Sequence, residues 1–375
     1  MHKVKILALT VGSVLFAANV NAANQVADAR GNAMGNTGVA SADYLVAPFY
    51  NPALGANFKE NDDFAVLVPA LALSARDADD SLTTIDDLQS VIDDYESSGS
   101  ADINTLNEIN GYLAELDGNA LLTVNANLGF AIAFPTYAVS SNLFARGYTE
   151  IVAGTEVVTD DYEASSVNIL AFGYSEVGLS LAKEFLLSNE KVSFGITPKY
   201  QQMTTYGQNV SLSDFDLDDY DKSKVTKNAV NFDLGAVWYR DDFHAAVAVK
   251  DLLAQKIDVK DNHVSGTYEL NTQITLGLAY AYDYFTAAID ADLTKQNRFR
   301  NADDDTQFVR FGMEGDAWGW AQLRAGYEID LQGTLENSIT AGIGLSPFNT
   351  VNLDIAGSYA GENQLGASAN LAFTF

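Results

Sequence analysis

The chain has 375 residues, of which 47% are hydrophobic, and a formal charge of −29 at pH 7. It contains no cysteine, which excludes disulfides, thiol catalysis and thiolate metal sites. The negative charge makes nucleic acid and anionic lipid poor partners, so we expect no nucleic-acid partner. Either solubility and adaptation to salt or divalent-cation binding at an outer surface accounts for this charge.

The first 22 residues have the features of a secretory signal peptide. Lys3 and Lys5 give a positive start, an apolar run covers residues 6–18, and Val20 and Ala22 stand at the −3 and −1 positions. The apolar run is too short for a membrane-spanning helix. We therefore predict export and cleavage after Ala22, and leave residues 1–22 out of the fold.

Residues 23–62 show no strand alternation and instead carry turn-forming residues. Gly31, Gly35 and Gly38 are closely spaced after Arg30, and Asn51-Pro52-Ala53 marks a turn. A nucleotide-binding loop is excluded because no strand precedes these glycines and no βαβ unit follows. We predict that residues 23–62 form a compact plug, or hatch.

Residues 76–120 form a long acidic connection with helical periodicity. Two apolar sets fall near helical spacing on either side of Ser98-Gly99-Ser100: Ile85, Leu88, Val91 and Ile92, then Leu106, Ile109, Leu113 and Leu116. The pattern predicts a helical hairpin over one mouth of the fold.

From about residue 64 onward the chain alternates apolar and polar residues in long segments. Clear examples are residues 122–134, 268–280, 285–293 and 351–358, where the second face is small, polar or charged. A β-sandwich mimics this locally, but repetition nearly to the end of the chain favours a barrel with a polar lumen. Short and long connections alternate. We predict one all-β, antiparallel transmembrane barrel over residues 63–375, with about 14 strands.

Two segments interrupt the alternation. In residues 170–181 the apolar set switches face near Ser175-Glu176, which predicts a β-bulge. In residues 192–200 Pro198 removes a ladder donor. The two irregularities open a gap in the wall or only curve it.

The polar face of the predicted strands carries charges of both signs. Because unpaired charges are costly in a narrow interior, we expect ion pairs among them or with the hatch residues Asp28 and Arg30. Substrate binding is the alternative role for these charges. The predicted lumen charges are Lys199, Asp233, Asp290, Asp292, Arg310, Glu314, Arg324, Glu328 and Asp354.

The sequence offers little support for a metal site or for catalysis. Asp214, Asp216 and Asp218 have the spacing that opens an EF-hand loop, but Asp219 and Val225 replace its glycine and final glutamate. A solvated acidic loop explains them as well. The histidines, His244 among them, form no grouping with a nucleophile and an acid. We predict a non-enzyme without cofactor or metal.

The last strand ends in alternating apolar residues that include Phe373 and Phe375. A terminal Phe resembles the signal by which the barrel-assembly machinery recognises outer-membrane proteins. Together with the signal peptide it predicts the outer membrane of a Gram-negative cell, with the lipid bilayer and lipopolysaccharide as surroundings.

The residues Ala29-Arg30-Gly31, Gly35, Gly38-Val39-Ala40 and Tyr50-Asn51-Pro52-Ala53 resemble the hatch of the FadL/TodX superfamily of outer-membrane transport barrels. Within it, the chain is most similar to the conjugal-transfer TraF-like branch. The resemblance implies passage of small hydrophobic compounds, gated by a hatch that includes Asn51-Pro52-Ala53. The charged lumen departs from this pattern, because a greasy ligand needs a local apolar pocket.

Three functions follow from these features. The first is passive, gated transport of small hydrophobic molecules. The second is an envelope or surface protein that acts through its acidic outer loops, in cell contact or conjugation. The third, an open polar porin, is disfavoured by the hatch.

Overall fold

A computed structural model describes residues 26–98, 102–214, 223–260, 265–300, 302, 304–317, 319–347 and 350–375. The predicted signal peptide lies outside these residues, as do Asp216, Asp218 and Asp219 of the acidic loop. Both remain predictions.

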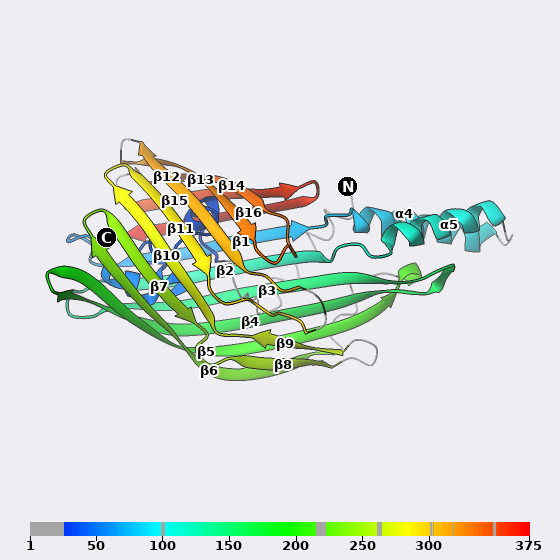
Figure 1. The fold of residues 1–375 in the computed structure, drawn as a ribbon, viewed down its shortest axis with the longest axis horizontal. Helices are drawn as coiled ribbons and strands as arrows, with labels where there is room; N and C mark the ends of the chain where they lie inside the picture. The colour runs from blue at the N-terminus through cyan, green and yellow to red at the C-terminus, as the bar shows by residue number, and fades with distance from the viewer. Residues whose placement is uncertain are drawn as a thin grey trace.

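Fourteen antiparallel strands close into a single barrel, which confirms the predicted fold (Figure 1). Around the wall the strands follow the order β1-β16-β15-β14-β13-β12-β11-β10-β7-β6-β5-β4-β3-β2 and back to β1. Their bounds are β1 Ala65–Arg76, β2 Leu122–Phe134, β3 Ser140–Val158, β4 Asp161–Leu187, β5 Glu190–Ser211, β6 Val225–Arg240, β7 Phe243–Lys250, β10 Gln273–Tyr282, β11 Phe285–Asp292, β12 Phe308–Ala317, β13 Ala321–Asp330, β14 Ser338–Leu345, β15 Val351–Gly361 and β16 Gln364–Thr374.

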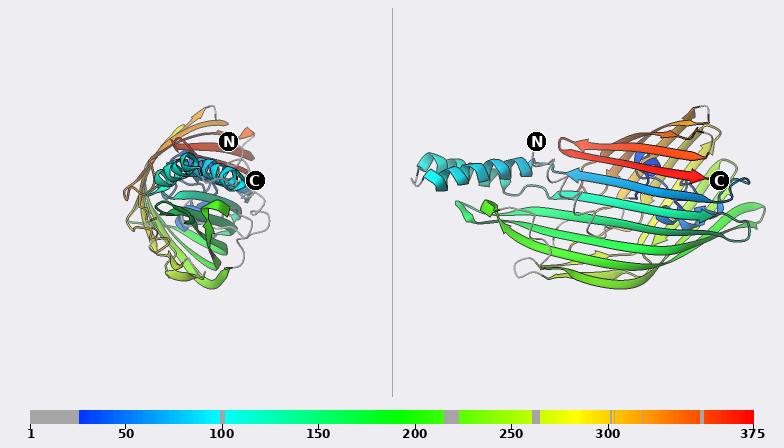
Figure 2. Two further views of the ribbon diagram at one scale, coloured as in Figure 1. Left: turned by 90° about the vertical axis from the view of Figure 1, so that its right-hand side faces the viewer. Right: turned by 180° about the vertical axis from the view of Figure 1, so that it is seen from behind.

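The wall is much taller on one side than on the other. Strands β4 and β5 have 27 and 22 residues, whereas β7, β11 and β14 have 8 each. Figure 2 shows that the long strands extend beyond the short ones toward the end of the barrel that carries α4 and α5. Along each strand, apolar side chains that are exposed on the outside alternate with buried side chains that face the lumen.

The bulge predicted near Ser175-Glu176 is wrong. Strand β4 keeps one register with β3 from Ser166 to Ala182. The apolar set switches face because Phe172 and Tyr174 are buried on the inner side, whereas Val177 is exposed on the outer side. Pro198 lies in β5 without a register shift, whereas β1 shifts its register between Leu67 and Ala70, beside Pro69.

The single strand predicted over residues 268–280 is also wrong. Residues Ser265–Leu270 form β9, which pairs with β8 (Gln255–Lys260) in a separate two-stranded sheet, and the wall strand β10 begins only at Gln273. Alternation alone did not reveal the break, because Tyr268 and Leu270 are apolar but are buried in an inner cluster.

The acidic connection forms the predicted helical hairpin, α4 (Ser81–Ser98) and α5 (Ile103–Leu116). Its apolar faces pack on each other and on Val167 and Ile169 of β4. In Figure 1 the hairpin extends beyond the barrel wall. Among the described residues, no helix is long and apolar enough to cross a membrane.

The N-terminal residues 26–56 lie inside the barrel, drawn in dark blue in Figure 1. They form α2 (Ala29–Ala33), α3 (Ala47–Tyr50) and the 3-10 helix η1 (Pro52–Ala56). Helix α2 contacts β13 to β16, and η1 contacts β3 to β6. We call residues 26–56 the inner segment.

Candidate functional site in the barrel lumen

Helix α2 is bound to the wall by its own backbone. The Ala29 amide donates to Asn370 Oδ1 at 2.7 Å, and the Gly35 amide donates to Thr340 Oγ1 at 2.9 Å. The same Thr340 hydroxyl donates to the Ala33 carbonyl at 2.8 Å. Asp28 caps the helix by accepting from the Gly31 amide at 3.0 Å. The wall therefore satisfies backbone groups that so short a helix leaves free.

Glycines of the wall allow the inner segment to approach closely. A Cβ on Gly326 of β13 would lie 2.1 Å from the Gly35 amide nitrogen, and one on Gly312 of β12 would lie 2.4 Å from the Met34 carbonyl oxygen. A Cβ on Gly195 would lie 2.3 Å from the Pro52 carbonyl carbon. Two of the predicted hatch residues, Gly35 and Pro52, are thus in backbone contact with the wall.

Inside the segment, Gly31 and Gly38 make room for Tyr50. A Cβ on Gly31 would lie 1.8 Å from Tyr50 Oη, and one on Gly38 would lie 2.3 Å from the same ring. Tyr50 Oη donates to Asp28 at 3.1 Å. Burial raises the pKa of Asp28, and Arg30 opposes this shift. The ring holds α2 and α3 together.

Asn51 is completely buried and joins the turn to the wall. Its side-chain oxygen accepts from the Ala53 amide at 3.0 Å, and its amide group donates to the Val39 carbonyl at 3.0 Å. It also lies 3.4 Å from the wall carbonyls of Ala236 and Val247. The predicted Asn51-Pro52-Ala53 turn is therefore a contact point between the segment and β6 and β7.

Arg30 forms a bidentate ion pair with Glu314 of the wall. Its Nε and Nη2 each lie 2.9 Å from a different oxygen of Glu314, and its Nη1 donates to the Ser41 carbonyl at 2.7 Å. Burial disfavours the charged guanidinium, but attraction by Glu314 outweighs burial and raises the pKa of Arg30. This geometry is the strong, directional form of an ion pair.

Three further wall side chains hold the segment. Asp290 accepts from the Gly38 and Val39 amides at 2.7 and 3.0 Å. Glu328 accepts from Asn36 at 2.9 Å, and Lys250 Nζ donates to the Phe49 carbonyl at 2.6 Å. Lys250 was missed from sequence, since it closes a strand next to a turn.

All nine predicted lumen charges face inward, and eight of them lie in ion pairs. Arg310 pairs with Asp292 and Glu328, and Arg324 pairs with Glu314 and Asp354. Lys199 Nζ lies 2.8 Å from both Asp233 and Asp251 and 3.4 Å from Glu176, which also pairs with Arg146. Asp290 holds the inner segment as described above. Arg146, Glu176 and Asp251 were missed, although the alternation of β3 and β4 places the first two on the inner face.

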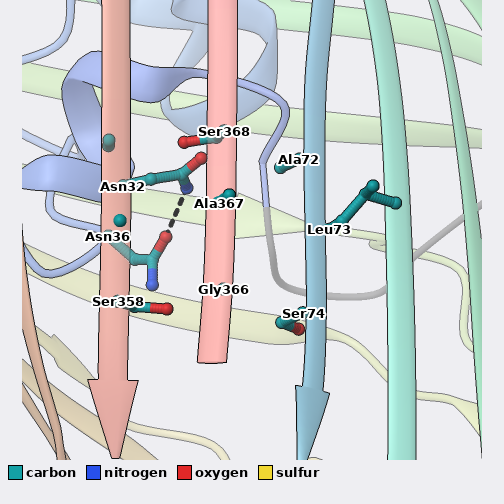
Figure 3. Close-up of a pocket in the computed structure, with 11 residues that line it drawn as sticks. Asn32, Asn36, Ala72, Leu73, Ser74, Ser358, Gly366, Ala367 and Ser368 are labelled. Atoms are coloured by element: carbon teal, nitrogen blue, oxygen red, sulfur yellow. Dashed lines mark hydrogen bonds between the residues drawn. The ribbon is translucent and has the colours of Figure 1, made fainter. Parts of the chain in front are cut away.

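A gap at this interface lies between α2 and strands β1, β15 and β16 (Figure 3). It is a cavity of about 20 Å³, enough for one water molecule. Asn32 Oδ1 and Ser368 Oγ have no hydrogen-bond partner there. On the opposite side the segment packs in an apolar cluster that includes Phe49 and Phe144. The inner segment thus has one apolar face and one polar face.

Other predicted residues take simple positions. His244 Nδ1 lies 3.2 Å from the Ala40 carbonyl. Phe375 stacks on Phe64, with ring centroids 4.6 Å apart, and Phe373 pairs with Val66 and Val351. Within the described ranges, no three His, Cys, Asp or Glu side chains gather so as to hold a metal ion.

Solved structures share this fold over nearly the whole chain. The Ralstonia pickettii toluene transporter TbuX has a TM-score of 0.57 at 13% identity, covering 92% of this chain and 98% of its own. The monoaromatic hydrocarbon channel CymD has a TM-score of 0.57 at 10% identity, covering 95% and 99%. A Pseudomonas aeruginosa FadL homologue has a TM-score of 0.55 at 11% identity, covering 96% and 99%. At such identities the likeness shows the fold alone.

No curated protein matches the chain in sequence. A family model described as "F plasmid transfer operon, TraF, protein" matches residues 48–292, which is more than half of the chain. The matched range begins in the inner segment and ends at the close of β11. The chain therefore belongs to the TraF protein family of the F plasmid transfer operon, on a barrel fold of the FadL/TodX type.

Proposed function

We propose that the protein is an outer-membrane channel for small hydrophobic molecules, in which residues 26–56 act as a hatch. The observation that carries the proposal is the position of this segment, inside a closed barrel and held by wall side chains from both halves. The whole-chain likeness to hydrocarbon channels and transporters supports the cargo class. No catalytic role is proposed for any residue.

The hatch contacts favour reversible closure. Most of them are single hydrogen bonds between a wall side chain and the hatch backbone, and each such bond has a net value of only about 1 kcal/mol because water replaces it. On the wall side, the apolar cluster beneath the hatch is rich in alanines: Ala131, Ala133, Ala246, Ala248, Ala279 and Ala288. Most of the apolar wall residues that undocking would expose are therefore alanines, with Leu67, Phe144 and Val237 as the larger ones.

An engineered disulfide tests the hatch in a chain that has no cysteine of its own. A Cβ on Gly129 of β2 would lie 3.3 Å from Ala27 Cβ, and one on Gly55 would lie 3.3 Å from Ala182 Cβ of β4. Both distances are close to the Cβ separation of a disulfide. The variants Ala27→Cys/Gly129→Cys and Gly55→Cys/Ala182→Cys each cross-link hatch and wall.

The measurement is uptake of a radiolabelled monoaromatic compound by Gram-negative cells that express each variant, before and after reduction. We expect the oxidised form to block uptake and the reduced form to restore it. Equal uptake in both forms would show that the hatch does not gate transport. Uptake no faster than in cells without the protein would refute transport itself.

A second candidate is contact with another cell or envelope protein through the α4–α5 hairpin, in keeping with the plasmid-transfer description of the family. The hairpin extends beyond the wall and exposes carboxylates such as Asp87, Asp93 and Asp94. A deletion of residues 81–117 that spares uptake but abolishes mating contact would favour this function.

A further inference from the structure

The connection between β11 and β12 crosses the lumen. Arg298 in this connection forms a buried ion pair with Glu150 of β3. In the closed strand order, β3 lies seven strands from β12 in either direction, which is as far apart as a 14-stranded barrel allows. A contact between the two must therefore span the interior.

The β8–β9 hairpin joins this crossing. The Glu269 amide donates to the Arg298 carbonyl and the Arg300 amide to the Thr267 carbonyl, both at 2.9 Å, so residues 298–300 lie along β9 as an added strand. On the other side, β8 is tied to the tall wall where Thr205 of β5 donates to the Asp258 carbonyl at 2.8 Å. We call β8, β9 and residues 298–300 the strap.

The strap is packed like a protein core. Tyr268 of β9 stacks on Phe172 of β4 with centroids 3.5 Å apart and planes at 5°, and Phe299 packs edge-on against Tyr268 at 5.0 Å. All three rings are at most 2% exposed. Arg298 Nε also donates to the Asp304 carbonyl at 2.7 Å, and the Phe299 amide donates to the Asp304 carboxylate at 3.0 Å.

We propose that the strap is a second closure of the lumen, separate from the hatch and latched by Glu150–Arg298 and the Phe172–Tyr268–Phe299 stack. The proposal rests on the proposed function only in placing both closures on a transport path. It explains why β4 carries the buried rings of Phe172 and Tyr174 on its inner face, in one cluster with residues of the strap. It also explains why β3 to β6 rise above the other strands, since their inner faces support the strap.

The test measures how fast a thiol on the hatch reacts with a bulky, membrane-impermeant reagent in intact cells. Asn36→Cys is the reporter, because Asn36 is partly exposed and bonds to Glu328, which pairs with Arg310 at the base of the crossing connection. Ser97→Cys on the exposed end of α4 is the control. All rates are compared within the Asn36→Cys background, where the lost bond to Glu328 is the same in every variant, and the reaction needs no cargo, so its outcome is distinct from that of the uptake assay.

Two kinds of variant disrupt the strap, one by removing residues 298–300 and the other by breaking the latch. Because Ala291 pairs with Val309, a short turn can replace residues 294–306 and leave the wall intact. Arg298→Ala breaks the latch, and Arg298→Lys keeps a positive charge opposite Glu150 and Asp304. We expect Asn36→Cys to react about tenfold faster or more in the turn variant and in Arg298→Ala, with a rate closer to that of the parent in Arg298→Lys.

The Ser97→Cys rate should stay constant in all backgrounds. If Asn36→Cys reacts as fast in the parent as in the turn variant, the strap does not close the lumen. Slow reaction in every variant would also overturn the proposal, since something other than the strap would then cover the hatch.

Discussion

A methyl group added to one wall glycine should dislodge the hatch. In Gly326→Ala the new Cβ would lie 2.1 Å from the Gly35 amide nitrogen and 2.3 Å from the Met34 carbonyl carbon. Both are backbone atoms and cannot rotate away. The opposing residue on β12 is Gly312, whose own approach to Met34 leaves no free space on that side.

Overpacking of this kind costs about 1–3 kcal/mol, and rigid backbone on both sides places Gly326→Ala at the upper end. The clash is between hatch and wall, so it is relieved when the hatch moves and the barrel stays. At about 1.4 kcal/mol for each factor of ten, the undocked fraction should rise by roughly 100-fold. Gly315→Ala is the matched control, because a Cβ there meets nothing within 4 Å.

The assay is thiol labelling of Ala47→Cys in detergent, where both ends of the barrel are open to the reagent. Ala47 is completely buried in the hatch and lies away from the clash. We expect fast labelling in Gly326→Ala, slow labelling in Gly315→Ala and unchanged thermal stability of the barrel in both. If Gly326→Ala labels as slowly as its control, close backbone packing is not what holds the hatch.

Three smaller predictions follow from single contacts. Asn51→Ala should also speed Ala47→Cys labelling, since it removes a cap of about 1 kcal/mol and leaves buried carbonyls unpaired. Lys199→Met should lower the free energy of unfolding by about 3–5 kcal/mol in urea titration, because it removes the positive partner of two buried aspartates. The hydrogen bond from Lys256 lowers the pKa of Glu269 to about 2. The ionised Glu269 carboxylate therefore stabilises the strap fully above the ordinary pKa of 4.5, and this stabilisation is lost as the pH falls toward 2. Hydrogen exchange of residues 255–260 should therefore rise, after correction for the intrinsic rate, between about pH 5 and about pH 3 in the parent but not in Glu269→Gln.

The number of strands was predictable because lipid imposes a local rule. Each wall strand must place apolar residues outward at every second position, so β2 and β15 can be read from a dozen residues alone. Pairing inside the lumen follows no local rule. Arg30 and Glu314 are 284 residues apart, and only closure of the barrel brings them together.

The strap was not predictable for a different reason. Tyr268 and Leu270 alternate with polar residues in the same way as lipid-facing residues, and the pattern cannot tell lipid from an apolar interior. The switch of face at Phe172 and Tyr174 was the one visible signal. It indicated an apolar surface on the lumen side, and a bulge was the wrong explanation because β4 keeps one register with β3 from Ser166 to Ala182.

A charged lumen is compatible with an apolar cargo if the charged side chains are already paired with one another before the cargo enters. Around Lys199 the ion pairs join two positive groups, Lys199 and Arg146, to three negative ones, Glu176, Asp233 and Asp251, so each charge has an opposite partner within the cluster. Its hydrogen bonds are also internal, since Gln201 donates to both Glu176 and Asp251. Such a cluster holds the wall around the hatch together and attracts ions only weakly, because opposite charges largely cancel at a distance. It follows that Asp251→Asn should make the charge of this site more positive by one unit. In planar-bilayer conductance, once the hatch and the strap are both removed, this variant should therefore select less strongly for cations than the same channel with Asp251.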